Sequence, residues 1–178
     1  MADLKNFLKR YNLYISTFKL TSFDSENNYY LCRDETKEVI DFDKIIAEKF
    51  TDSNKRPKSF DAIYIHENSL YCIEFKNQKP GKIDNEEIQG KLEEGKKELI
   101  HFLKESKIDI KKINFIYAVV YKECKSNFEK YKCGLVQSKI EFGLEKFKKS
   151  GFVKDVFTSD IAFFKRAFKL KMKEELAC

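Results

Sequence analysis

The chain has 178 residues, of which 42% are hydrophobic and 36% are charged. This length favours one folded domain over residues 1–178, and an aromatic content of 15% excludes an intrinsically disordered chain. No apolar run approaches the roughly 20 residues that a membrane span needs, and the first residues do not resemble a signal peptide. We therefore predict a cytoplasmic protein that has no membrane partner.

The net charge of +6 is compatible with a polyanionic partner such as nucleic acid. However, only four of the 35 basic residues are arginines, and the abundance of Lys, Asn, Ile, Phe and Tyr is typical of an AT-rich genome. Composition bias therefore explains much of the charge, and simple solvation of the lysines is an equally good interpretation.

The five cysteines are widely spaced and form no C-x-x-C pair, and only two histidines could complete a zinc site. This pattern argues against structural zinc and against a disulfide framework. We expect free thiols at Cys32, Cys72, Cys124, Cys133 and Cys178.

Apolar spacing predicts the elements of the first third of the chain. Residues 3–14 have helical spacing, residues 14–20 alternate as in a strand, and residues 29–32 could form a second short strand. An apolar stripe predicts a helix over residues 39–50, and residues 51–59 form a polar loop.

The middle of the chain has the strongest signals. Residues 60–65 and 70–76 are two strands separated by a short turn, which predicts a β-hairpin. A helix over residues 85–105 follows, and residues 113–121 are apolar almost throughout, as in a central strand. The order strand, strand, helix, strand predicts an α/β protein with a mixed sheet.

Two signals mark the start of the long helix. Asp84 with Glu87 three residues later is the pattern of a capping box. Ile88, Leu92 and Leu99 then begin one buried stripe.

The last third predicts a helix over residues 142–149, a strand over 152–157 and a helix over 159–176. In the final helix, Phe163, Phe164, Ala167 and Leu170 are expected to face inward. Its outward face is basic, with Lys165, Arg166, Lys169, Lys171 and Lys173, and solvation alone would explain it.

The hairpin brings three charged residues together. A symmetric turn centred between Glu67 and Asn68 pairs Asp61 with Glu74, and Lys76 lies on the same face. The Cβ atoms of Asp61 and Glu74 would lie about 5 Å apart. Two carboxylates at that distance repel by roughly 3 kcal/mol at an effective dielectric constant of 20.

A divalent cation would offset this repulsion. Carboxylate oxygens suit Mg²⁺ or Mn²⁺, and a metal-bound water beside an ammonium group is a nucleophile suited to a phosphodiester. Lys76 could deprotonate that water or stabilise the developing charge. An internal salt bridge among Asp61, Glu74 and Lys76 is the alternative.

An Asp early in one strand, a hairpin and then Glu-x-Lys resembles the PD-(D/E)XK nuclease superfamily, over about residues 38–121. The resemblance implies a restriction-endonuclease-like α-β-β-β-α-β core, with residues 122–178 as a C-terminal α/β extension. It also implies Mg²⁺-dependent hydrolysis of phosphodiester bonds in nucleic acid, with DNA as the expected substrate. Asp61 and Glu74 match the metal-binding acids, and Lys76 matches the catalytic lysine.

The chain also departs from the pattern of the superfamily. Phe60 replaces an often-seen Pro, and the loop over residues 51–58 leaves little room for the first strand of the meander. We expect that strand to come from the N-terminal region, or the hairpin to stand alone at that edge.

The resemblance implies further site residues. The first helix often supplies an acid to the metal, for which Glu48 is the first candidate and Glu38 the second. The helix after the hairpin often contributes a polar side chain, for which the candidates are Gln89 and Lys96. Helix-surface residues of these types are more often only solvated or structural.

Two alternatives to an active nuclease stay open. The chain could be a catalytically silent nucleic-acid-binding or assembly module with the same fold, or a structural protein with a salt-bridge cluster. A nuclease with one site per chain would need a homodimer to cut both strands of a duplex.

Overall fold

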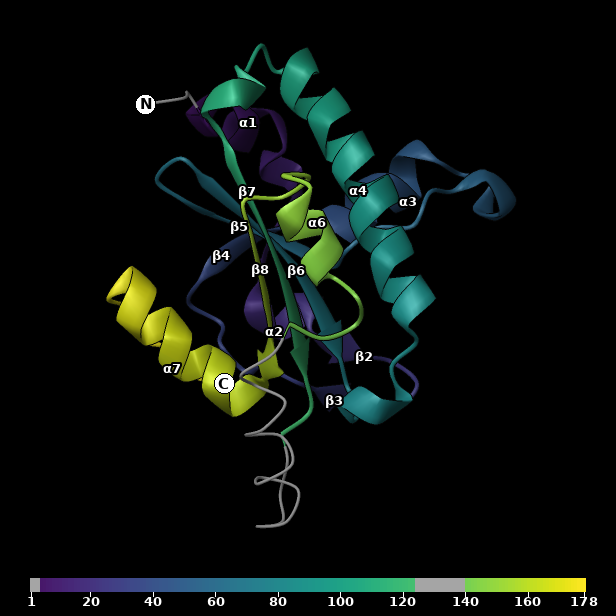
Figure 1. Cartoon of the computed structure of the whole chain (residues 1–178). Coiled ribbons are helices and arrows are strands. Elements are labelled where there is room, and N and C mark those ends of the chain that lie inside the picture. Colours follow the sequence, from purple (N-terminus) through teal and green to yellow (C-terminus); the bar gives the residue numbers. More distant parts are fainter. Residues whose placement is uncertain (1–3, 124–139) are drawn as a thin grey trace.

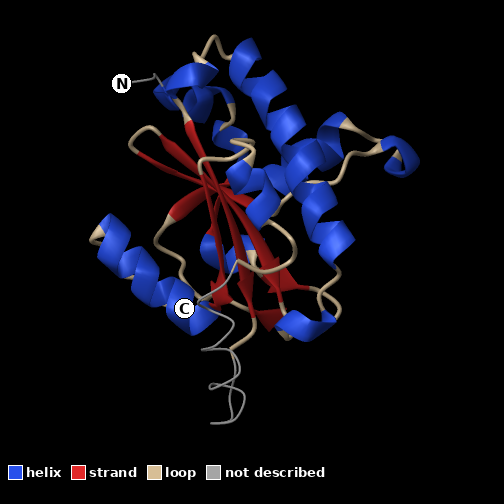
Figure 2. Cartoon of the chain, in the orientation of Figure 1, coloured by secondary structure: helices blue, strands red, loops and turns tan. Residues whose placement is uncertain are grey.

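A computed structural model describes residues 4–123 and 140–178 of the chain. The strands of its main sheet are β1 (Ile15–Thr17), β4 (Glu38–Asp41), β5 (Ala62–His66), β6 (Ser69–Lys76), β7 (Asn114–Tyr121) and β8 (Asp155–Asp160). They form a six-stranded sheet in the order β1-β4-β5-β6-β7-β8 (Figure 2). A separate two-stranded sheet joins β2 (Phe23–Asp24) and β3 (Tyr29–Tyr30).

Helices cover both faces of the main sheet (Figure 1). The long helix α4 and the C-terminal helix α7 lie on opposite sides of the sheet, so the protein is an α/β protein with three layers. The described helices are α1 (Leu4–Arg10), α2 (Phe18–Thr21), α3 (Phe42–Lys49), α4 (Asn85–Glu105), α6 (Glu145–Lys149) and α7 (Ile161–Met172).

The sheet is mixed, as predicted. Neighbouring strands from β1 to β6 are antiparallel, whereas β6, β7 and β8 run parallel. Helix α4 is the crossover between β6 and β7, which is the connection that a parallel pair requires. Every residue of β7 after Asn114 is buried, which confirms the central strand predicted from its apolar sequence.

Each face of the sheet has its own apolar core. Residues of α1, α3, α4 and α6 pack on one face, where Phe42, Leu92 and Tyr117 are buried. Residues of α2 and α7 pack on the other face, where Phe18, Ile73 and Phe164 are buried.

The predicted helix over residues 39–50 was wrong at its start. Residues Glu38–Asp41 form strand β4, and the helix begins at Phe42 because the Asp41 side chain caps it by accepting from the Lys44 backbone N–H. Strand β4 pairs with β5 through Ile40 and Ile63. The strand that pairs with the hairpin therefore lies before helix α3, in a stretch whose apolar residues fit the period of a helix as well as that of a strand.

Three other predicted segments have different bounds. The strand over 14–20 is only Ile15–Thr17, because Thr17 caps helix α2. The strand over 152–157 lies at Asp155–Asp160, after a turn in which the Val153 N–H donates to the Phe147 carbonyl. The helix over 142–149 is shorter, at Glu145–Lys149.

The C-terminal helix α7 is also shorter than predicted. It begins after Asp160, whose side chain accepts from the Phe163 N–H, and it ends where Lys173 adopts a left-handed conformation with φ 57°. Leu170 is 83% exposed, so its predicted inward position was wrong, and Phe168 and Met172 are buried instead.

The expectation that all five cysteines are free thiols was wrong. A disulfide joins Cys32 to Cys178, which are 146 residues apart in the sequence. Cys72 is a buried free thiol, whereas Cys124 and Cys133 lie outside the described residues. No described helix is both long enough and apolar enough to cross a bilayer.

Candidate active site

The hairpin of β5 and β6 positions the predicted charged residues, and its register is the predicted one. Ala62 pairs with Ile73 and Ile63 pairs with Cys72, so the residue numbers of each pair have the same sum. Asp61 directly precedes β5, and its Oδ2 accepts a hydrogen bond from the Phe75 backbone N–H at 2.6 Å. This bond holds the Asp61 carboxylate against the end of β6, next to Glu74.

Phe60 does not continue the alternation of the hairpin, because it lies on the opposite face of the sheet from Phe75. It lies in the core under α4, where its ring stacks on Phe42 with centroids 4.6 Å apart. A Cβ atom added at Gly95 of α4 would lie 2.9 Å from the Phe60 ring. The glycine therefore lets α4 approach the start of the hairpin closely.

Glu74 lies at the centre of the charged cluster and is only 1% exposed. Its Oε1 accepts from Lys91 Nζ at 2.7 Å and is 3.2 Å from Lys76 Nζ. Lys76 Nζ also donates to Glu87 Oε1 at 2.6 Å. The second carboxylate oxygen, Glu74 Oε2, is buried and has no hydrogen-bond partner among the described residues.

Lys91 and Glu87 are the residues that sequence reasoning missed. Both lie on the first turns of α4, four residues apart, and therefore on one face of the helix. Glu87 was assigned to a capping box, but the Asp84 side chain accepts from the Glu86 N–H, and Glu87 contacts Lys76 instead. The spacing of Glu87 and Lys91, in a helix that follows Glu-x-Lys, was the available signal.

Burial and charge shift the pKa values of this cluster. Burial, together with repulsion from Glu74, raises the pKa of Asp61 well above its ordinary value. Burial also raises the pKa of Glu74, although attraction to Lys91 and Lys76 opposes it. Burial lowers the pKa of Lys76, but attraction to Glu74 and the hydrogen bond to Glu87 outweigh it, so its pKa lies above the ordinary value.

The number of charges differs from the sequence-based estimate. Asp61 and Glu74 face two ammonium groups, Lys76 and Lys91, rather than Lys76 alone. The net charge of these four groups is zero when all are ionised. Glu87, whose side chain is 41% exposed, adds one negative charge at the edge of the cluster. The extra lysine weakens the argument that repulsion alone requires a cation.

An open cleft of about 300 Å³ gives access to one side of the cluster. Asp61, Lys76 and Asn77 line one wall, and residues 21–27 of the β2 to β3 region line the other. Asn77 Nδ2 donates to Asp24 Oδ2 at 2.9 Å, which holds this region against the end of β6. A ligand in the cleft could therefore contact Asp61 and Lys76.

The structure does not bring Glu48 to this cluster. Glu48 Oε2 accepts from the Tyr14 hydroxyl at 2.8 Å, and its side chain lines a different depression beside Phe102. Among the residues of α3, Asp43 lies near enough to contribute to the raised pKa of Asp61. Its carboxylate accepts from the Ser59 hydroxyl.

Gln89 and Lys96 contact the C-terminal part of the chain. Gln89 Nε2 donates to the Phe142 carbonyl at 2.7 Å, and its Oε1 accepts from Lys146 Nζ at 2.7 Å. Lys96 Nζ donates to the Phe152 carbonyl. Both side chains of α4 therefore link the helix to the segment before β8.

Few side chains of the cluster could coordinate a metal ion. Within residues 4–123 and 140–178, no group of three His, Cys, Asp or Glu side chains could hold a metal ion. Asp61 and Glu74 offer two carboxylates, and the unpartnered Glu74 Oε2 is a donor atom that a hard cation would satisfy. The pair therefore fits Mg²⁺ or Mn²⁺ as two of its ligands, with water or phosphate oxygens as the others.

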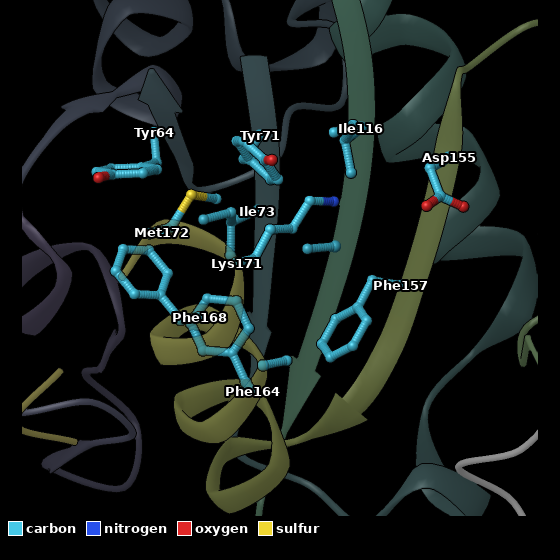
Figure 3. Close-up of a pocket in the computed structure, with 12 residues that line it drawn as sticks. Tyr64, Tyr71, Ile73, Ile116, Asp155, Phe157, Phe164, Phe168, Lys171 and Met172 are labelled. Carbon is cyan, nitrogen blue, oxygen red and sulfur yellow. The ribbon is translucent and has the colours of Figure 1, made fainter. Parts of the chain in front are cut away.

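A smaller apolar pocket of about 80 Å³ lies on the other face of the sheet, under α7 (Figure 3). Tyr64, Phe164 and Phe168 line it, and Lys171 and Asp155 lie at its edge (Figure 3). Asp155 pairs with Lys148 at 2.7 Å. The sheet separates this pocket from the core on which α4 packs.

Comparison of the chain with protein-family models, with curated proteins and with solved structures gave no match. The fold is that of an α/β protein with a six-stranded mixed sheet and helices on both faces.

Proposed function

We propose that the protein is a Mg²⁺-dependent nuclease of the PD-(D/E)XK type, with a restriction-endonuclease-like fold, which hydrolyses phosphodiester bonds in DNA. The observation that carries the proposal is the cluster of Asp61, Glu74 and Lys76 at one end of the hairpin, beside an open cleft. The antiparallel order β4-β5-β6, followed by α4 and a parallel β7, supports the proposed fold, whereas helix α3 lies between β4 and β5 and not before all three strands.

Each residue would have a distinct role. Asp61 and Glu74 would hold the cation, and a bound Mg²⁺ or Mn²⁺ would supply a polarised water and charge stabilisation at the phosphate. Lys76 Nζ lies 3.2 Å from Glu74 Oε1 and donates to Glu87 Oε1, so its ammonium group would be placed to stabilise negative charge on the phosphate. Lys91 would orient the Glu74 carboxylate through its 2.7 Å hydrogen bond.

A catalytically silent nucleic-acid-binding module with the same fold is the second candidate. The observation that favours it is the pairing of Glu74 with two lysines, because this pairing satisfies Glu74 Oε1 without a metal. Within the described residues no group of three His, Cys, Asp or Glu side chains could hold a metal ion, which points the same way. A purely structural salt-bridge cluster would share both features.

We also propose the cytoplasm as the location. The Cys32–Cys178 disulfide argues against it, because disulfides are rare in cytosolic proteins. Thiol trapping with a mass-tagged maleimide in lysed cells would decide the point. A fully reduced pair would support the cytoplasm, and a fully oxidised pair would favour an oxidising compartment.

Cleavage assays test the function. The protein would be incubated with plasmid, linear duplex, single-stranded DNA and RNA in Mg²⁺, Mn²⁺ or EDTA. We expect metal-dependent cleavage by the parent and a loss of at least about 100-fold in Asp61→Asn, Glu74→Gln and Lys76→Met. Glu93→Gln, on the exposed side of α4, is the matched control and should cleave at the parent rate.

Two outcomes would overturn the nuclease proposal. One is cleavage at the parent rate by both Asp61→Asn and Glu74→Gln. The other is a parent protein that cleaves none of the substrates in either metal. Binding of labelled DNA in EDTA then separates the remaining candidates, because a silent nucleic-acid-binding module should bind it and a purely structural protein should not.

A further inference from the structure

A second open cleft, of about 400 Å³, lies beside the candidate active site. We call it the basic cleft. Four cationic side chains line it, together with Tyr29 and one acid, Glu123. The cationic residues are Arg33, Lys122, Lys165 and Arg166.

The fold places the basic cleft at the same end of the sheet as Lys76. Lys122 follows the last residue of β7, and its backbone N–H donates to the Lys76 carbonyl at 3.1 Å. Helix α7, which carries Lys165 and Arg166, begins at the end of β8 (Figure 1). The carboxyl ends of β6, β7 and β8 therefore meet at the two clefts, where ligands of α/β sheets usually bind.

The β2 and β3 strands form the wall between the two clefts. Phe23 lines the cleft beside Asp61, and Tyr30 lines the basic cleft. Their rings pack against each other with centroids 4.6 Å apart. A chain-like ligand that extends from one cleft to the other would therefore pass this pair of strands.

The basic cleft has an excess of positive charge. None of its four cations forms an ion pair with an Asp or Glu side chain of residues 4–123 and 140–178, although Lys165 Nζ donates to a main-chain oxygen of Cys178, the last residue of the given sequence. By contrast, Lys169 on the same helix pairs with Glu175 at 2.5 Å. The predicted basic face of the last helix is thus divided: Lys165 and Arg166 line the basic cleft, whereas Lys169 lies outside it and is paired with an acid.

The kinds of cation and the exposed ring indicate the chemistry of the ligand. Two of the four arginines of the chain, Arg33 and Arg166, line the cleft, and guanidinium groups match the geometry of phosphate oxygens. Tyr29 is 37% exposed, and Lys122 Nζ lies 5.3 Å from the centre of its ring. Cations beside an exposed aromatic ring are the usual combination for binding unpaired nucleotides.

We infer that the basic cleft binds one unpaired strand of nucleic acid and leads it to the active-site cleft, with Tyr29 as a stacking surface for a base. The inference rests on the proposed nuclease function. An unpaired strand is favoured over a duplex, because bases inside a duplex stack on one another and present no face to a tyrosine.

Binding can be measured independently of cleavage. Fluorescence anisotropy in EDTA would compare a labelled 20-nucleotide single strand with its duplex, using the intact protein. We expect tighter binding of the single strand. Lys165→Gln/Arg166→Gln should weaken it at least tenfold and lower the slope of log affinity against log salt by roughly 1, since each phosphate contact in a single strand contributes about 0.7.

Matched controls test whether position matters as well as charge. Lys111→Gln/Lys112→Gln removes two exposed lysines next to the start of β7, at the opposite end of that strand, and should bind like the parent. Tyr29→Ala should weaken single-strand binding at least fivefold, whereas Tyr29→Phe keeps the ring and should bind normally. Circular dichroism and thermal midpoints equal to those of the parent would exclude misfolding.

Several results would overturn the inference. One is equal single-strand binding by the Lys165/Arg166 and Lys111/Lys112 variants. Another is a preference for duplex that Tyr29→Ala leaves unchanged. A third is that heparin displaces the labelled strand as well as unlabelled single-stranded DNA does. If Asp61→Asn still cleaves while the basic-cleft variants lose binding, the proposed active site is refuted and the inference about the basic cleft is supported. The inference alone falls if Asp61→Asn is inactive and the basic-cleft variants bind normally.

Discussion

Asp61 and Glu74 are neighbours with different electrostatic surroundings. Glu74 has two lysine ammonium groups at its Oε1, whereas Asp61 receives a hydrogen bond from a backbone N–H. The pKa of Asp61 is accordingly raised well above its ordinary value by burial and by the charge of Glu74. Without a metal, an ionised Asp61 should cost folding energy. Burial raises the pKa of Glu74 as well, but loss of its charge would leave two lysine ammonium groups without their shared partner, and we expect this loss to be the larger effect.

Asp61→Asn should therefore stabilise the metal-free protein. The amide oxygen can still accept from the Phe75 N–H, and the repulsion from Glu74 disappears. We expect the free energy of unfolding at pH 8 in EDTA to rise by about 1–2 kcal/mol, a part of the roughly 3 kcal/mol repulsion between two carboxylates about 5 Å apart, because the nearby lysines offset the rest. Urea denaturation measures this change, with Glu93→Gln as the exposed control.

The pH dependence gives the sign of this effect. Because the folded state raises the pKa of Asp61 above 3.8, the folded chain binds a proton more tightly than the unfolded chain. The stability contributed by this group is fully present below the unfolded value and is lost as pH rises through the folded value. The gain in Asp61→Asn should thus vanish near pH 3.5, and a gain that is equal at all pH values would contradict the assignment.

Glu74→Gln should have the opposite effect. It removes the charge that Lys76 and Lys91 share and leaves both ammonium groups in a largely buried place. We expect a loss of about 2 kcal/mol in the free energy of unfolding in EDTA, less than for a fully buried pair because both lysines are partly exposed. A double-mutant cycle with Lys91→Met checks the cause, and additive effects of the two changes would refute the pairing.

Among the elements, the C-terminal segment after α7 is held to residues 32–34 by two links. One is the Cys32–Cys178 disulfide, and the other is the hydrogen bond from the Ala177 N–H to Asp34 Oδ2 at 2.8 Å. Cys178 also lines the basic cleft. The disulfide therefore stabilises one wall of that cleft.

Breaking the disulfide should destabilise the protein. It closes a loop of 146 residues, and a cross-link of that kind typically contributes about 2–4 kcal/mol by restricting the unfolded chain. We expect Cys178→Ser to lower the free energy of unfolding by that amount under oxidising conditions. A reducing agent should lower the stability of the parent and leave Cys178→Ser unchanged, and an equal effect on both would exclude the disulfide as the cause.

Helix α4 also connects the two parts of the chain around the undescribed residues 124–139. Both ends of the Gln89 amide are hydrogen-bonded to the segment after residue 140, at Phe142 and Lys146. Gln89→Ala should lower the free energy of unfolding by about 1 kcal/mol or more, the usual contribution of such bonds. Denaturation of this variant, compared with Lys97→Ala on the exposed side of α4, measures it; equal stability of the two variants would contradict a structural role.

For the whole molecule, the parallel strands determine where ligands could bind. Strands β6, β7 and β8 end together, so that Lys76, Lys122 and the first turn of α7 lie at one edge of the sheet. The apolar pocket lies under α7 (Figure 3), on the opposite face of the sheet from α4 (Figure 1). The two polar clefts thus share one end of the molecule, and this arrangement is what the proposed strand path depends on.

Local features of the sequence were enough to predict the hairpin, the long helix and the central strand. The register of the hairpin follows from its short turn and from the alternation of apolar and polar residues. The 21-residue helix has apolar residues at helical spacing, so its buried side can be recognised from the sequence without knowledge of the packing. The sequence therefore predicted that Asp61 and Glu74 would lie close together, because the turn of the hairpin fixes which residues of its two strands are paired.

Tertiary structure decided what depends on distant parts of the chain. Residues 38–41 became a strand because β1 and β5 pair with them, although their apolar residues also fit a helix. Lys91 reached Glu74 because of the way α4 is rotated on the sheet, which helical spacing does not specify. Cys32 and Cys178 met because the sheet and α7 bring the two segments together over 146 residues, a separation at which spacing predicts no contact.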